Sequence, residues 1–458
     1  MHDLTTGSIP KHIIRMAVPM AIGMVFQTLY YLVDLYFVGR LGDVALAGVS
    51  AAGNLQFIVM ALTQVLGIGT MVPIAHAAGR KDRADANLIF NQSLTLSAIA
   101  FAAVMISGWL FADRYLMTLA ADAPTQQAGR DYMVWFLPAM GLQFALISIG
   151  SALRGTGITK PTMIVQVLTV VLNAILSPIL IAGWGTGRPL GVLGASLATA
   201  ISVLVAVVVL LWYFVRLEHY VALDRTQLKP HLPTWGRMMR IGVPAGGEFL
   251  LLFFSIGINY YLIRNFGSAA QAGFGVGQRM MQAIFLPVMA VAFAAAPIAG
   301  QNLAAGLPDR VRQTFFEAIK IGTVLMALAT GFAHWRPEWL ASPFTDDPEV
   351  IRVAALFLRI ISWNFVASGI IFTCSGMFQA MGNTVPTVIS SGVRLGVFAA
   401  GAFWVASLPG FKLEWLWYSS VVATSLHCLF NVWLLQIEAS RRMAGGLAPT
   451  PQVATQES

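Results

Sequence analysis

Two carboxylates lie deep inside apolar stretches of this sequence. Asp34 interrupts an apolar run that starts near Ile13, and Glu248 follows Pro244 in a second such run. An ionisable group at membrane depth is costly and usually serves the movement of ions or substrate. Such a carboxylate can exchange a proton for a cation, because burial and neighbouring charges decide which form is favoured. We therefore take Asp34 and Glu248 as candidates for ion coupling. For Glu248 the alternative is a structural role as the fixed partner of Arg279 or Arg394.

Other polar residues recur at helical spacing beside these carboxylates. Positions three, four or seven apart share one face of a helix, and a polar face must turn away from lipid. The predicted polar faces consist of Gln27, Tyr31 and Asp34; Gln166, Asn173 and Ser177; Glu248, Ser255 and Asn259; and Asn364, Ser368, Ser375 and Gln379. Any single Ser, Thr or Asn among them could instead form hydrogen bonds that hold helices together.

These faces predict a polar cavity between helices. The residues that we expect to line a substrate cavity are Gln27, Tyr31, Gln166, Ser255, Asn259, Asn364 and Ser368. Proline can kink a helix because it lacks an N–H donor, so Pro19, Pro178 and Pro244 are candidate hinges. Arginines 279, 359 and 394 also fall within apolar stretches, where we expect them to pair or to extend toward the membrane surface.

The composition identifies a membrane protein. The 458 residues are 57% hydrophobic and only 10% charged, with a mean hydropathy of +0.73, which is too apolar for a soluble chain of this length. Stretches of about 20 apolar residues recur, each long enough to cross a bilayer as a helix. We predict an all-α polytopic protein with twelve transmembrane helices, at residues 13–38, 45–75, 87–112, 128–151, 161–183, 190–215, 238–263, 270–301, 314–334, 349–378, 385–407 and 415–437.

The positions of the basic residues predict the orientation. Of 28 Lys and Arg, 17 fall on the side of the termini, 8 on the other side and 3 within spans. By the positive-inside rule both termini are cytoplasmic, and we expect a multi-pass protein of a bacterial-type inner or plasma membrane. The net charge of +8 is thus explained by topology, and we expect no nucleic-acid partner. Cys374 and Cys428 both fall in apolar spans and predict no disulfide.

The chain repeats itself at an offset of 225 residues. The motif RMAVP at residues 15–19 aligns with RIGVP at 240–244, and LRGTGITKPT at 153–162 aligns with FQAMGNTVPT at 378–387. One register that holds across a block of this length indicates two copies of a six-helix unit. Because six is even, both copies enter the bilayer from the same side and form parallel repeats, as in alternating-access carriers.

The repeat predicts the domain organisation. We assign an N-lobe of six helices to residues 1–215, a cytoplasmic linker to 216–237, a C-lobe of six helices to 238–440 and a disordered cytoplasmic tail to 441–458. We expect the protein to act as a monomer without a cofactor.

The sequence resembles the multidrug and toxic compound extrusion (MATE) family. The resemblance covers about residues 8–440, and its most specific pieces are VDLYFVGRLGDVALAG, LRGTGITKP, LNAILSPILI and QAMGNTVPT. It implies two six-helix lobes that export drug-like, often cationic compounds while H⁺ or Na⁺ moves inward.

The resemblance also implies roles for individual residues. Asp34 falls on the family's acidic residue of the first helix, and Asn173 falls on an asparagine of the same ion-coupling network. Members similar to the archaeal and DinF type carry an aspartate four residues after that asparagine, where this chain has Ser177. NorM-type members also use C-lobe acids, and Asn383 occupies the position of one of them. With fewer carboxylates than these members, we expect H⁺ coupling through Asp34, Asn173, Ser177 and Glu248, with Na⁺ at Asp34 as the alternative.

Other functions remain as alternatives. A lipid or polyprenyl-glycan flippase of the same wider superfamily would need a cavity richer in arginines than the three in these spans provide. A major facilitator carrier also has two six-helix halves, but it lacks the paired loops at Leu153 and Phe378. The motifs HExxH and GxSxG of membrane enzymes are absent, so we predict no enzymatic activity.

Overall fold

The computed structural model describes residues 2–119, 122–185, 187–217, 220–443 and 446–447. In these ranges all regular secondary structure is helical, as predicted. The α-helices are α1 (Ile9–Gly39), α2 (Asp43–Gly53), α3 (Leu55–Gly79), α4 (Arg83–Leu119), α5 (Ala123–Gly155), α6 (Lys160–Ala182), α7 (Gly191–Leu217), α8 (Leu232–Ile263), α9 (Ser268–Ala304), α10 (Pro308–Trp335), α11 (Pro337–Ala341), α12 (Pro348–Ile361), α13 (Phe365–Ala380), α14 (Val385–Ala406) and α15 (Leu413–Arg442).

Twelve helical stretches of the described chain are long and apolar enough to cross a membrane, which confirms the predicted number of spans. Two of them are interrupted. The second consists of α2 and α3, which part at Asn54, and the tenth consists of α12 and α13 around a 3₁₀ turn at Ser362–Asn364. Ser362 donates its hydroxyl proton to the Arg359 carbonyl at 3.0 Å. Such side-chain bonds to the backbone compete with regular helix, and hydropathy does not detect them.

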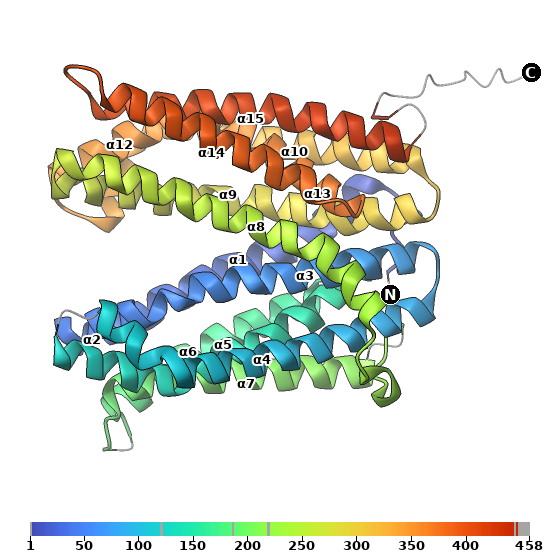
Figure 1. Ribbon diagram of the computed structural model, residues 1–458, viewed down its shortest axis with the longest axis horizontal. Helices are drawn as coiled ribbons and strands as arrows, with labels where there is room; N and C mark the ends of the chain where they lie inside the picture. Colours follow the sequence, from blue (N-terminus) through green and yellow to red (C-terminus); the bar gives the residue numbers. More distant parts are fainter. Residues whose placement is uncertain (1, 120–121, 186, 218–219, 444–445, 448–458) are drawn as a thin grey trace, which may run out of the picture. The chain divides into compact units, whose positions relative to one another are not determined.

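The chain forms two compact units (Figure 1). The first unit contains residues 19–246, and the second contains residues 3–18 together with residues 247 onward. Two helices are therefore divided between units, α1 at Pro19 and α8 at Gly247. Pro19 and Pro244 lie at or within three residues of these divisions. The prediction of lobes bounded at residues 215 and 238 stays a prediction.

Each unit has its own aromatic and aliphatic core. In the first unit Phe90, Phe136 and Phe144 are buried among α3, α4, α5 and α7, which contact one another. In the second unit Phe274 and Trp417 are buried between α9, α12 and α15, and α14 lies beside α15 (Figure 1).

Glycines allow α8 to approach α3 closely in the first unit. A Cβ added at Gly242 would overlap the carbonyl oxygen of Val65, and one at Gly246 would meet the Ala61 carbonyl oxygen at 2.9 Å. Only the absence of side chains at these positions lets the two backbones meet.

The segment before α8 is bound to α4 by side-chain amides. Asn91 donates to the carbonyl of Ala222 at 3.0 Å and accepts from the Asp224 backbone N–H at 2.9 Å. Gln92 donates to the carbonyl of Lys229 at 2.8 Å and accepts from the His231 backbone N–H at 2.9 Å. The predicted linker is therefore an ordered part of the first unit from Tyr220 onward, whereas residues 218–219 lie outside the described ranges.

A similar arrangement holds the segment before α1 in the second unit. The backbone N–H of Leu4 donates to the Gln301 amide oxygen at 3.2 Å, and Asn302 donates to the Leu4 carbonyl at 3.1 Å. Arg310 donates to the carbonyl of Gly7 at 2.9 Å. At the other end of the chain α15 continues to Arg442, and the predicted tail beyond residue 447 lies outside the described ranges.

Candidate functional site

Asp34 lies near the end of α1 in the first unit and is half-buried. One carboxylate oxygen accepts a hydrogen bond from the Tyr132 hydroxyl of α5 at 3.4 Å. The other oxygen, Oδ1, is buried and has no hydrogen-bond partner among the described residues. A carboxylate in this setting is costly to keep ionised unless a proton or a cation neutralises it. The geometry therefore suits a carboxylate that exchanges a bound proton for a bound cation.

The remaining residues predicted around Asp34 are spread along two helices. Gln27 is exposed on α1, and the side chain of Tyr31 lies outside the described part of the structure. On α6 the Ser177 hydroxyl donates to the Asn173 amide oxygen at 3.3 Å, and both side chains are fully buried. The Asn173 amide nitrogen has no hydrogen-bond partner in the described part of the chain. Among the described residues of the first unit, the Asn173 amide nitrogen is thus an unpaired donor and the Asp34 Oδ1 oxygen is an unpaired acceptor.

A close contact sets the register between α1 and α6. A Cβ added at Gly23 would overlap the side-chain oxygen of Gln166, so the two helices meet there. The first and fifth spans run in the same direction through a membrane, and each residue advances a helix by about 1.5 Å. Eleven residues beyond this contact lie Asp34 on α1 and Ser177 on α6. The two residues are therefore expected at the same depth, although no hydrogen bond joins them among the described residues.

The second unit brings two of the predicted polar faces together. The Ser375 hydroxyl of α13 donates to the Glu248 carboxylate of α8 at 3.2 Å. Ser391 and Thr387 of α14 also lie beside this carboxylate. Glu248 is thus held by hydroxyl groups, which leaves it able to accept a proton or a cation.

The other residues predicted in the second unit lie apart from Glu248. Asn259 donates its amide to the Ser255 carbonyl one turn earlier at 2.9 Å. Asn364, in the 3₁₀ turn, donates to the Ser420 carbonyl at 3.4 Å, and its own side-chain oxygen is unpaired in the described ranges. Ser368 is half-buried on α13.

The three arginines within spans differ in their contacts. Arg359 contacts Glu338 at 3.5 Å, as an ion pair. Arg279 and Arg394 have no hydrogen bond or direct ion pair within the described residues. The charges of Arg394 and Glu248 are nevertheless close enough to interact.

Helical spacing did not indicate every residue of these clusters. Tyr132 belongs to none of the predicted polar faces, so only the packing of α5 against the rest of the unit reveals it. The α14 residues had a signal that could have found them, because Thr387, Ser391 and Arg394 recur at spacings of four and three on one helical face.

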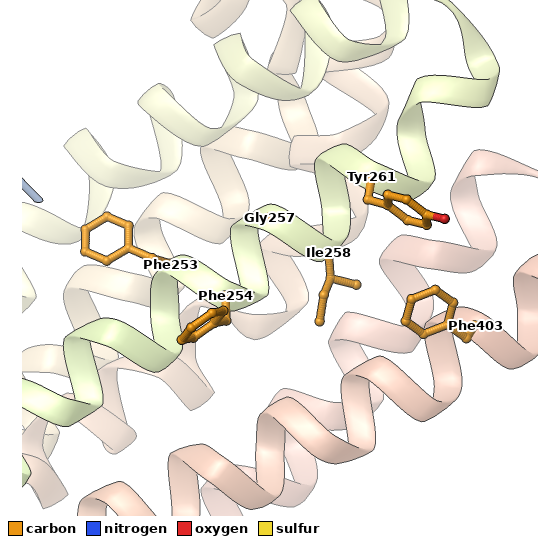
Figure 2. Close-up of a pocket in the computed structure, with 6 residues that line it drawn as sticks. All are labelled: Phe253, Phe254, Gly257, Ile258, Tyr261 and Phe403. Carbon is orange, nitrogen blue, oxygen red and sulfur yellow. The ribbon is translucent and has the colours of Figure 1, made fainter. Parts of the chain in front are cut away.

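An apolar pocket of about 280 Å³ opens on α8 (Figure 2). Phe253, Phe254, Gly257, Ile258 and Tyr261 of α8 and Phe403 of α14 line it. At 100° per residue these α8 positions lie on the side of the helix opposite Glu248, Ser255 and Asn259. Neither Ser255 nor Asn259 lines this pocket, and its walls suit an apolar or aromatic group.

Comparison with known proteins shows the family to which this chain belongs. A family model described as MatE matches residues 19–179 and, a second time, residues 244–404. The chain belongs to the MatE family. The predicted resemblance is thereby confirmed, and the two matches of this transporter family lie 225 residues apart, in agreement with the internal repeat. The protein is therefore a multi-pass membrane transporter.

Similar MatE proteins come from several bacteria. The chain is 28% identical to "Probable multidrug resistance protein YoeA" of Bacillus subtilis, with 90% of this chain and 91% of that protein covered. It is 26% identical to "Multidrug export protein MepA" of Staphylococcus aureus, with 92% of each covered. It is 25% identical to "FAD transporter" of Shewanella oneidensis, with 86% of this chain and 87% of that protein covered.

Solved structures support the fold. A MOP superfamily transporter from Pyrococcus furiosus superposes with a TM-score of 0.87 at 24% identity and covers 96% of this chain and 97% of its own. An outward-facing multidrug resistance MATE family transporter gives a TM-score of 0.88 at the same identity and the same coverage.

Proposed function

We propose that this transporter exports drug-like, amphipathic and cationic compounds in exchange for H⁺ by alternating access. The observation that carries this proposal is Asp34, a carboxylate in a transmembrane helix with one weak hydrogen bond and one unpaired buried oxygen. The printed names of the relatives, which include multidrug export and FAD transport, support export of organic molecules.

The proposed cycle uses Asp34 as the exchanging group. In the cytoplasm-facing state the ionised carboxylate attracts the cationic substrate. In the outward-facing state a proton binds Asp34 and removes the charge that retained the substrate. Tyr132 orients the carboxylate, while Asn173 and Ser177 provide polar groups at its depth. Glu248 is a second proton-accepting group in the other unit.

Conformational change is assigned to the helices that both units share. Since α1 and α8 pass from one unit to the other near Pro19 and Pro244, a bend at either proline would move part of one unit. Pro178 lies directly after Ser177 within α6 and is the third proposed hinge. We further propose that the termini are cytoplasmic, in a bacterial-type inner membrane, and that one chain suffices for transport.

The proposal is tested with purified protein in proteoliposomes. Efflux of the fluorescent cation ethidium is followed while a proton gradient or a sodium gradient is imposed separately. We expect efflux with the proton gradient alone and its loss in Asp34→Asn. Asp131→Asn serves as the control, because within the described residues Asp131 accepts a hydrogen bond only from Gln127, on the surface of α5.

Three outcomes would contradict parts of the proposal. Coupled efflux at the wild-type rate in Asp34→Asn would exclude Asp34 as the exchanging group. Efflux that needs sodium would favour Na⁺ at Asp34. Movement of labelled phospholipid or polyprenyl lipid without ethidium efflux would favour the flippase alternative.

A further inference from the structure

Arg394 lies in the middle of a membrane-spanning helix. It is the tenth of 22 residues in α14, so at 1.5 Å per residue it lies about 14 Å from one end of the helix and about 18 Å from the other. These distances are too long for an arginine side chain to reach the membrane surface along the helix. A charge at this depth must face the interior of the protein or a water-filled cavity.

The face of α14 that carries Arg394 points into the second unit. Ser390, Ser391 and Phe398, which lie one turn before and after it, are all buried. Ser391 lies beside the Glu248 carboxylate of α8, and Ser390 bonds to the ring nitrogen of His427 on α15 at 3.2 Å. The guanidinium is therefore directed toward α8 and α15, away from lipid.

The guanidinium nevertheless lacks an acceptor. Glu248 and His427 are close enough to interact with its charge. Even so, Arg394 has no hydrogen bond and no direct ion pair within the described residues, and its side chain is half-buried. Glu248 is bound by the Ser375 hydroxyl instead. Guanidinium groups carry five N–H donors in a planar fork that fits a carboxylate or a phosphate, so the expected acceptor comes from outside the chain.

We propose that Arg394 binds an anionic group, a carboxylate or a phosphate, of the exported molecule. This inference rests on the proposed export function and narrows its substrate class to amphipathic compounds that include zwitterions. Arg394, in the second unit, serves the anionic group of such a compound. Glu248 balances the charge of Arg394 when the site is empty, which limits the affinity and permits release.

A pair of dyes that differ by one methyl group tests this assignment. Rhodamine B carries a free carboxylate and a cationic ring system, whereas its methyl ester carries only the cation. Binding of each dye to the purified full-length protein is measured by fluorescence anisotropy, and efflux of each is measured in proteoliposomes. We expect Arg394→Gln to weaken rhodamine B binding by about tenfold to a hundredfold, as for a lost charged hydrogen-bond pair, and to leave the methyl ester unchanged.

Two further variants separate recognition from structure. Arg359→Gln removes an arginine that is already paired with Glu338, and we expect it to bind both dyes like the wild type. Arg394→Lys keeps the charge without the fork and should retain part of the rhodamine B binding. Gel filtration and thermal unfolding in detergent confirm that each variant is folded.

The outcomes are distinct. Equal loss of both dyes in folded Arg394→Gln, or unchanged rhodamine B binding, would overturn the assignment. Dye binding that depends on Arg394 without proton-driven efflux would contradict the proposed function and leave the anion site intact. The phosphate of a lipid is tested with added phosphatidylglycerol. Inhibition of rhodamine B binding only when Arg394 is present would show that the same site accepts a lipid phosphate.

Discussion

The Asp34 carboxylate has a single hydrogen-bond donor within the described structure, the Tyr132 hydroxyl. The sequence indicated Asp34, because an acidic residue inside an apolar stretch can be found from the sequence alone. It did not indicate Tyr132, because a partner on another helix depends on how the helices pack. The same reason explains why the polar faces of α8 and α13 could be predicted, whereas the hydrogen bond between Glu248 and Ser375 could not.

Tyr132→Phe tests the contact at this scale. The variant keeps the aromatic ring, which packs against Phe136 with centroids 4.8 Å apart, and removes only the hydroxyl. Because a hydrogen bond of this kind contributes about 1 kcal/mol, we expect proton-driven ethidium efflux to fall roughly fivefold with no change in folding. Phe136→Leu, which alters the ring contact and the surrounding core but keeps the Tyr132 hydroxyl, is the comparison. A wild-type rate in Tyr132→Phe would show that the hydroxyl does not orient Asp34.

Arg394 shows how far sequence alone reaches. Its position inside an apolar span was evident, and pairing was the natural expectation for a buried charge. The structure leaves it without a direct partner in the described residues, because the nearest carboxylate is bound by hydroxyl groups. Whether a buried charge has a direct partner cannot be predicted from the sequence alone, because the answer depends on the positions of all neighbouring side chains.

At the scale of elements, hydropathy predicted the number of membrane spans. It placed each span over the correct stretch of chain, because about 20 apolar residues are needed to cross the bilayer. It did not predict that α2 and α3 part at Asn54 or that a 3₁₀ turn separates α12 from α13. These interruptions arise from local backbone geometry, to which a window average is insensitive.

The packing of α8 on α3 makes a prediction about stability. In Gly242→Ala the new methyl group would overlap the Val65 carbonyl, so the backbones must separate. Overpacking of this kind costs about 1–3 kcal/mol, and we expect a lower midpoint of thermal unfolding in detergent. Gly257→Ala on the same helix is the matched control, because nothing lies within 4 Å of its added Cβ. Equal midpoints for both variants would contradict the close packing.

The amides that bind the segment before α8 make a second prediction. Gln92→Ala removes bonds to Lys229 and His231, and we expect trypsin to cleave faster after Arg225, whereas Pro230 protects the bond after Lys229. Asp224 caps the 3₁₀ turn Arg225–Leu228, because its carboxylate accepts hydrogen bonds from the Thr226 backbone N–H and hydroxyl. These bonds lower the pKa of the Asp224 carboxyl, so it stays ionised at neutral pH and the cap is lost only as the pH falls below the ordinary value of 3.8. The ratio of the cleavage rate of Gln92→Ala to that of the wild type should therefore be the same at pH 6 and pH 8. Gln127→Ala, far from the linker in sequence, should leave the cleavage rate unchanged.

At the scale of the whole molecule, the predicted orientation is tested by labelling with a maleimide that does not cross membranes. We expect a cysteine at Ser407, between α14 and α15, to react in intact cells, and a cysteine at Leu223 to react only after permeabilisation. Both positions are exposed. The wild-type protein is the control, because Cys374 is buried and Cys428 is half-buried. The opposite labelling pattern would place the termini outside.

The internal repeat was the feature of the whole molecule that sequence predicted best, and the doubled family match confirms it. The exchange of helix ends between the units was not predictable. Residues 3–18 belong with the second half of the chain and residues 232–246 with the first, whereas a repeat in sequence indicates only that the halves are alike.

This exchange has a consequence for biosynthesis. Residues 3–18 leave the ribosome early, yet the unit that receives them is not finished until the last span has been translated. The first unit in turn remains open until residues 232–246 emerge. The nascent chain must therefore keep its opening helix in a provisional place during insertion, and a gene divided within the linker would yield two fragments that each lack a piece of their own unit and hold a piece of the other.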